Sequence, residues 1–360
     1  MLTLSLLLAC TGATPDDTAV AGTPSTSPLG DGDGSPESVE FTYILGEEEK
    51  VFDPRDIGFD AEGNLWIANR SDDRTFIVFN PGTPDQDYDR RKDGYAEHFM
   101  EETMALSFDT GEQFGSCGES RNTYNDNAPP NDFMGPVLWS TDLEIFAEQN
   151  PEGLGSHLDM LHESPLCMGM AWEVANVYWV FDGKNESIVR YDFAEDHDVG
   201  QDYHGDGIIR RLDEPVVARE EDVPSHMMID PATGILYVAD TGNDRVLWID
   251  TASGQDGGNL RVSAEPVEEY VSWEGASWGV FAEGFDRPAG LATDGENVWV
   301  GEYGTGVIHE LDMDGNTVYT LDTGVGEESL HGIELGPDGK LWIVDNAGAA
   351  VLRIDPPNLD

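Results

Sequence analysis

The chain has 360 residues, of which 39% are hydrophobic, enough to bury a sizeable core. Its 18 Lys and Arg against 72 Asp and Glu give a formal net charge of −54, which repels nucleic-acid phosphates and so excludes a nucleic-acid-binding function. Two interpretations of the acidity stay open: a solvating surface, or carboxylate sites for cations, calcium above all. The 41 Gly, the 20 Pro and the short apolar runs indicate an all-β chain with many turns.

Residues 1–10 predict an export signal. They form an apolar run, too short to span a bilayer, that ends in Leu7, Leu8, Ala9 and Cys10. These four residues resemble the lipobox of bacterial lipoproteins, although no Lys or Arg precedes the run. The resemblance implies cleavage before Cys10 and lipid on its thiol and amine, and hence an exported protein tethered in the bacterial cell envelope. The alternative is an apolar N-terminus without this role.

Residues 11–38 are rich in Thr, Ser, Pro, Gly and Asp. A segment of this composition buries too little apolar surface to order itself, so we expect a disordered tether between the lipid and a folded domain. The folded domain is expected to span residues 39–360.

One pattern recurs along that domain: an apolar strand, a polar turn, a second strand with an aromatic residue, an Asp or Asn, and a third strand. Five clear copies and one degenerate copy occupy, in order, residues 56–69, 104–142 (degenerate), 169–182, 227–240, 290–302 and 332–345. Each copy is a small sheet with two apolar faces, which stacking around an axis buries. We therefore predict a six-bladed β-propeller with an insertion at about residues 110–165.

These repeats resemble the NHL family, and the segment from Asp240 to Val246, Asp-Thr-Gly-Asn-Asp-Arg-Val, matches its pattern best. The resemblance covers roughly residues 50–357 and implies a six-bladed propeller. Because the chain ends in a third strand, residues 39–45 are expected to add the outer strand of the last blade and so close the ring.

If Cys10 carries lipid, Cys117 and Cys167 remain, and an exported protein meets an oxidising compartment. We expect these two residues to form a disulfide. Closing a loop of about 50 residues is worth roughly 4 kcal/mol in the chain-entropy model. The alternative is two separate buried thiols.

Loops that enter the innermost strands of a propeller gather at one mouth of the central channel. The residues just before the repeats include Arg55, His226 and His331. The repeat is similar to that of the peptidyl-hydroxyglycine amidating lyases, in which entry-position His residues bind a catalytic zinc and a calcium lies deeper. The resemblance implies that His226 and His331 bind zinc or another divalent metal, although the third entry His is missing.

Histidines in the loops before the third and fourth blades are candidates for the missing ligand, because His is a common ligand of zinc-like metals. They are His157, His162 and His204. The alternative is solvated or helix-capping loop histidines. Arg55 is a candidate for binding an anionic substrate, and a salt bridge is its alternative.

Two functions follow. One is a monomeric, membrane-tethered propeller that binds a small molecule or protein at the channel mouth. The other is a metal-dependent lyase or lactonase-like hydrolase with a His-lined channel site. The sequence does not choose between an enzyme and a binding protein.

Overall fold

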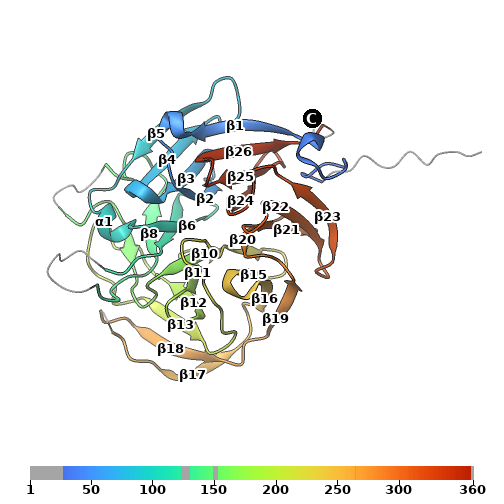
Figure 1. Cartoon of the computed structure of the whole chain (residues 1–360). Helices are drawn as coiled ribbons and strands as arrows, with labels where there is room; N and C mark the ends of the chain where they lie inside the picture. Colours follow the sequence, from blue (N-terminus) through green and yellow to red (C-terminus); the bar gives the residue numbers. More distant parts are fainter. Residues whose placement is uncertain (1–26, 123–129, 149–152, 264, 358–360) are drawn as a thin grey trace, which may run out of the picture.

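The computed structural model describes residues 27–122, 130–148, 153–263 and 265–357. In this part of the chain the strands form six sheets around one axis, and the innermost strands meet near the centre (Figure 1). The chain is therefore an all-β, six-bladed propeller, as the repeats predicted. Residues 1–26, with the expected export signal, Cys10 and most of the expected tether, lie outside the described residues.

The six blades are numbered in chain order, each starting from its innermost strand. Blade 1 contains β2 (Pro54–Phe59), β3 (Leu65–Asn69), β4 (Arg74–Phe79) and β5 (Asp87–Arg91). Blade 2 contains β6 (Thr103–Phe108), β7 (Gln113–Gly118), β8 (Val137–Ser140) and β9 (Asp159–Met160). Blade 3 contains β10 (Cys167–Val174), β11 (Val177–Asp182), β12 (Ser187–Asp192) and β13 (Ile208–Leu212).

Blades 4 to 6 complete the ring. Blade 4 contains β14 (Met227–Asp230), β15 (Ile235–Asp240), β16 (Arg245–Asp250) and β19 (Trp278–Glu283). Blade 5 contains β20 (Pro288–Thr293), β21 (Asn297–Glu302), β22 (Val307–Asp312) and β23 (Thr317–Asp322). Blade 6 contains β24 (Leu330–Leu335), β25 (Leu341–Asp345), β26 (Ala350–Asp355) and β1 (Glu40–Gly46). A short helix, α1 (Ala96–Phe99), precedes β6, and single 3-10 turns lie at Pro36–Ser38, Glu47–Glu49, Arg70–Asp72 and Thr241–Asn243.

The repeat pattern has a local cause in the turn between the first two strands of a blade. In blade 1 the carboxylate of Asp60 accepts hydrogen bonds from the backbone N–H of Asn64 at 2.9 Å and from the indole N–H of Trp66 at 2.8 Å. In blade 6 the indole of Trp342 donates to Asp338 in the same way, at 3.2 Å. The acidic turn residue thus satisfies the polar atom of an otherwise apolar aromatic side chain, which can then be buried.

These aromatic side chains form the contacts between blades. Trp66 of blade 1 packs into one cluster with Phe114 and Trp139 of blade 2, and Trp342 of blade 6 packs with Ile57 of blade 1. Each blade therefore buries its apolar surface away from water only when its neighbour is in place, which makes folding of the ring cooperative.

The ring closes as predicted. Strand β1 pairs antiparallel with β26, with Glu40 opposite Asp355 and Gly46 opposite Ala350. The folded domain also begins earlier than the sequence indicated, because residues 27–38 pack against blades 5 and 6. Leu29 is fully buried in the cluster that contains Trp299. The expected tether is therefore shorter than 11–38 at its C-terminal end.

A disulfide between Cys117 and Cys167 confirms the predicted pairing, with a Cα–Cα distance of 5.6 Å. It joins β7 of blade 2 to β10 of blade 3. Strand β7 itself lies inside the range assigned to the insertion, so the long connections of blade 2 run from β7 to β8 and from β8 to β9.

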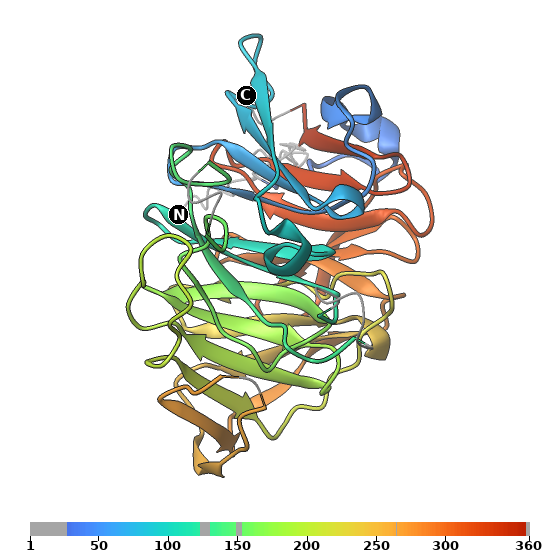
Figure 2. The same cartoon turned by 90° about the vertical axis from the view of Figure 1, so that its left-hand side faces the viewer.

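Blade 4 contributes a hairpin that the sequence did not indicate. Strands β17 (Gln255–Asn259) and β18 (Glu269–Glu274) leave blade 4 between β16 and β19, and β18 pairs in parallel with β13 of blade 3. Blade 3 thus becomes a six-stranded sheet, and the hairpin forms the orange end of the molecule in Figure 2. Glu265, between these two strands, lies beside His162 and His204.

Candidate functional site

The buried histidines fall into two groups, and the first lies in the central channel. His226 immediately precedes β14 of blade 4 and is 5% exposed. Its Nε2 lies 3.1 Å from the carbonyl oxygen of Met104 in blade 2 and 3.5 Å from Oδ1 of Asp56 in blade 1. Because blades 1 and 4 stand opposite each other in a six-bladed ring, the side chain of His226 crosses the channel.

His331 and Arg55 fill the adjoining part of the channel. Nη1 of Arg55 lies 3.5 Å from Nδ1 of His331 and donates to the backbone carbonyl of Asp222, and Nη2 forms an ion pair with Asp53 at 2.8 Å. Burial, followed by the positive charge of Arg55, holds the pKa of His331 well below its usual value. The neutral imidazole thus tolerates the guanidinium, and Arg55 makes the salt bridge that was its alternative role.

Further along β24, a carboxyl group faces the same channel. Glu334 lines a hollow between the innermost strands. Burial, with a contribution from the charge of Asp56, raises the pKa of Glu334 to about 8. At neutral pH this side chain is mostly protonated and uncharged.

The second group of histidines surrounds a cavity of about 280 Å³ at the rim of the ring, called here the rim cavity. One contributing element is α1, which lies beside blade 2, away from the point where the innermost strands meet (Figure 1). The cavity is lined by Tyr95, His98, Phe99, Asn122, Phe133, Leu154, His157, His162, Asp202, His204 and Glu265. These residues come from loops of blades 2 and 3, from α1 and from the hairpin of blade 4.

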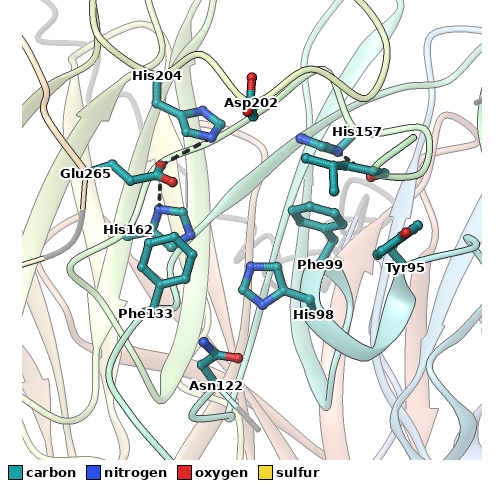
Figure 3. A pocket seen from close by; sticks show the side chains of 11 residues that line it. Tyr95, His98, Phe99, Asn122, Phe133, His157, His162, Asp202, His204 and Glu265 are labelled. Carbon is teal, nitrogen blue, oxygen red and sulfur yellow. Dashed lines mark hydrogen bonds and ion pairs between the residues drawn. The ribbon is translucent and has the colours of Figure 1, made fainter. Parts of the chain in front are cut away.

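A chain of polar contacts forms one wall of the rim cavity (Figure 3). Oε2 of Glu265 lies 3.4 Å from Nε2 of His204 and 3.5 Å from Nδ1 of His162. Nδ1 of His204 lies 2.6 Å from Oδ1 of Asp159, which is 1% exposed. Both ring nitrogens of His204 therefore face carboxylates, an arrangement that favours the imidazolium form.

The opposite wall is aromatic. Figure 3 shows His157, Phe99 and His98 across the cavity from Glu265 and His162. The rings of Phe99 and His157 stack with centroids 4.0 Å apart. On the first wall, the ring of Phe133 covers that of His162 at 3.5 Å.

Burial sets the charge of these imidazoles. It lowers the pKa of His98 to about 4, with help from His162, and that of His157 to about 4 against the opposing effect of its hydrogen bond to Leu154. Burial also lowers the pKa of His162, although Glu265 opposes it. For His204, burial acts downward, but the hydrogen bond and charge of Asp159 outweigh it and raise the pKa.

The sequence joined these histidines into one site, whereas the structure places them in two groups. The structure gathers His157, His162 and His204 around the rim cavity, whereas His226 and His331 fill the channel. His98 and Glu265 were missed. His98 lies outside the repeats, and Glu265 comes from a hairpin that crosses to another blade, so no local pattern indicated either of them.

The lyase resemblance implies a metal in the channel. Within residues 27–122, 130–148, 153–263 and 265–357, no group of three or more His, Cys, Asp or Glu is arranged to hold a metal ion. The guanidinium of Arg55 beside His331 would also repel a cation. The described channel residues, as arranged here, do not fit zinc or calcium. None of the helices in the described part of the chain is both long and apolar enough to pass through a bilayer.

No protein-family model and no curated protein matches the sequence. Among solved structures, regucalcin from Agrobacterium tumefaciens, described as a calcium-binding protein, is similar at 14% identity over 87% of this chain and 93% of that chain, with a TM-score of 0.52. Virginiamycin B lyase from Staphylococcus aureus matches at 12% identity over 88% and 98%, with a TM-score of 0.50. An auxiliary nutrient binding protein from Bacteroides thetaiotaomicron matches at 10% over 88% and 76%, with a TM-score of 0.51. At these identities the similarity shows the propeller fold alone.

Proposed function

We propose that this chain is an exported, lipid-anchored propeller of the NHL type that works as a monomer and binds a small ligand in the rim cavity. The observation that carries the proposal is the pair of polar side chains on one cavity wall. In the described structure, Nε2 of His162 is buried without a hydrogen-bond partner, and Oε2 of Glu265 is buried with only two imidazole nitrogens near it, at 3.4 and 3.5 Å. Buried polar atoms rarely remain unsatisfied, so these two favour a ligand that pairs with them.

Features outside the cavity support the location. The disulfide between Cys117 and Cys167 indicates folding in an oxidising compartment. The residues Leu7, Leu8, Ala9 and Cys10 resemble a lipobox, which would place the lipid on Cys10 at the outer surface of a bacterial membrane. The ligand would then be an extracytoplasmic small molecule, and the net charge of −54 opposes nucleic acid as a partner.

A second candidate function is catalysis by the Asp159–His204 pair. A carboxylate that holds one ring nitrogen of a His, here at 2.6 Å, orients the other nitrogen for general acid or base chemistry. Lyase or lactonase-like hydrolysis fits this chemistry, and a lyase and a calcium-binding protein are both among the propellers of similar fold. The described channel residues do not fit a metal, so this reaction would depend on the Asp159–His204 pair.

The test is a fragment screen by ligand-observed NMR on the full chain, followed by crystal structures of the hits. We expect hits in the rim cavity that bind at least tenfold more weakly to His162→Gln. The matched control is His226→Gln in the channel, which should bind them as the wild type does. Hits that bind only in the channel, or none that contact His162, would contradict the proposal. Turnover of a hit that His204→Gln abolishes, with binding retained, would favour catalysis.

A further inference from the structure

The contacts and charges around the rim cavity indicate the chemistry of its ligand. We propose that the cavity takes a small organic cation with an aromatic or apolar body, the cationic nitrogen beside Glu265 and the body between Phe133 and Phe99. This inference rests on the proposed function, that the rim cavity binds a ligand.

The polar end of the ligand is defined by Glu265. Its Oε2 is buried, and both neighbouring imidazole nitrogens lie at or beyond the outer limit of a good hydrogen bond. A carboxylate has room for about four hydrogen bonds, and an ammonium group offers three donors and no acceptor. His162 adds an acceptor, because its Nδ1 faces Glu265 and its other nitrogen, on the cavity side in Figure 3, has no partner in the described structure.

The charge balance of the cavity favours a cation over an anion. His98 and His157 are neutral near pH 7, because burial has lowered the pKa of each to about 4. The positive charge of His204 is matched by Asp159 at 2.6 Å. The carboxylates of Glu265 and Asp202 remain as net negative charge on the lining.

The long-range field acts in the same direction. With a net charge of −54, the surface attracts small cations and repels carboxylates and phosphates. Local and global charge therefore select the same sign of ligand, and an anion would have to overcome both.

The two aromatic walls define the rest of the ligand. Phe133 lies on the wall of Glu265, and Phe99 lies on the other (Figure 3). Their ring faces favour a flat apolar body and attract a nearby cation through the negative face of the ring. A volume of about 280 Å³ lies just below the usual range for small-molecule sites, which fits a single-ring amine rather than a peptide or an oligosaccharide.

Three probes of matched shape test the charge: phenethylamine, 2-phenylethanol and phenylacetate, titrated calorimetrically into the full chain at low salt. We expect phenethylamine to bind at least tenfold more tightly than 2-phenylethanol, and phenylacetate to bind most weakly. Glu265→Gln should remove the preference for the amine. Glu268→Gln makes the same charge change at an exposed position of the same loop, outside the cavity lining, and should leave the preference intact.

The outcomes separate this inference from the proposed function. Equal binding of the amine and the alcohol, or tightest binding of phenylacetate, would overturn the cation while leaving a ligand-binding cavity in place. Binding of the amine that is the same in Glu265→Gln would overturn the inference too, since the cation would then sit elsewhere. If neither the probes nor the fragment library occupies the cavity, both proposals fail. Phe133→Leu, which keeps an apolar wall, is the second variant should Glu265→Gln unfold, and it should weaken all three probes alike.

Discussion

The channel and the rim cavity each bury histidines, but the partners of those histidines differ. In the channel, His226 is held by a backbone carbonyl and Asp56, and His331 lies against Arg55, so the side chains from several blades contact one another across the axis. Around the rim cavity, His162 and His204 flank Glu265, and His204 also meets Asp159 at 2.6 Å, whereas Nε2 of His162 has no hydrogen-bond partner in the described structure. Histidines in the channel therefore contact several blades, whereas those at the rim line an open cavity.

The disulfide should show the largest effect, because it joins blade 2 to blade 3, the two blades whose loops form most of the rim cavity. Replacing Cys117 and Cys167 by Ser should lower the free energy of unfolding by about 4 kcal/mol, since the loop between them regains its entropy in the unfolded chain. Denaturant unfolding measures the loss. The same variant should bind cavity ligands more weakly, because the disulfide holds Cys167 in place and residues 153–166, which include His157 and His162 of the cavity lining, lead directly into Cys167. Cys10→Ser is the matched control and should change neither quantity. A double variant as stable as the wild type would contradict the expectation.

Alkaline pH should lower the stability of the folded protein through Glu334 in the channel. The pKa of Glu334 is raised to about 8 in the folded protein by burial, from about 4.5 in the unfolded chain. Its contribution to stability is therefore complete below about pH 4.5 and is lost as pH rises through 8. At about 1.4 kcal/mol per pKa unit, the loss between pH 5 and pH 8 is roughly 2–4 kcal/mol. Glu334→Gln should remove this slope in unfolding curves; an unchanged slope would place the titrating group elsewhere.

Acidic pH should lower the stability of the folded protein through His98 and His157 at the rim cavity. Burial lowers the pKa of His98 and His157 to about 4, from about 6.5 in the unfolded chain. Below pH 6.5 the unfolded chain takes up protons that the folded chain refuses, so stability falls between pH 6.5 and 4. His98→Gln should reduce that fall by about 1–3 kcal/mol. NMR titration of the imidazole signals checks the pKa values directly, and a value near 6.5 for either residue would contradict the prediction.

Metal removal should have the smallest effect. The sequence predicted a divalent metal on His226 and His331, whereas the described channel places Arg55 beside His331. Because the guanidinium of Arg55 lies beside His331 and would repel a metal ion, chelation should leave the unfolding temperature unchanged. Elemental analysis should find no stoichiometric zinc. A metal bound at one equivalent, and lost in His226→Ala, would restore the channel as the site.

The sequence by itself determined the blades. Each repeat carries its own turn, as Asp60 and Trp66 show, and its own alternation of apolar residues, so local chemistry fixes the number of sheets and the closure by β1. The cysteine pair was predictable for the same kind of reason, since an exported chain with two spare cysteines tends to join them.

Only the tertiary structure decided which histidines share a site. His204 meets Glu265 because the hairpin of β17 and β18 leaves blade 4 and pairs with β13 of blade 3, a contact between segments with no common local pattern. The position of Leu29 in a core between blades 5 and 6 likewise has no local signal within a polar segment. Strand and turn preferences act over a few residues, whereas the rim cavity is assembled from five loops and the segment that carries α1, so its ligand chemistry appears only once the ring is complete.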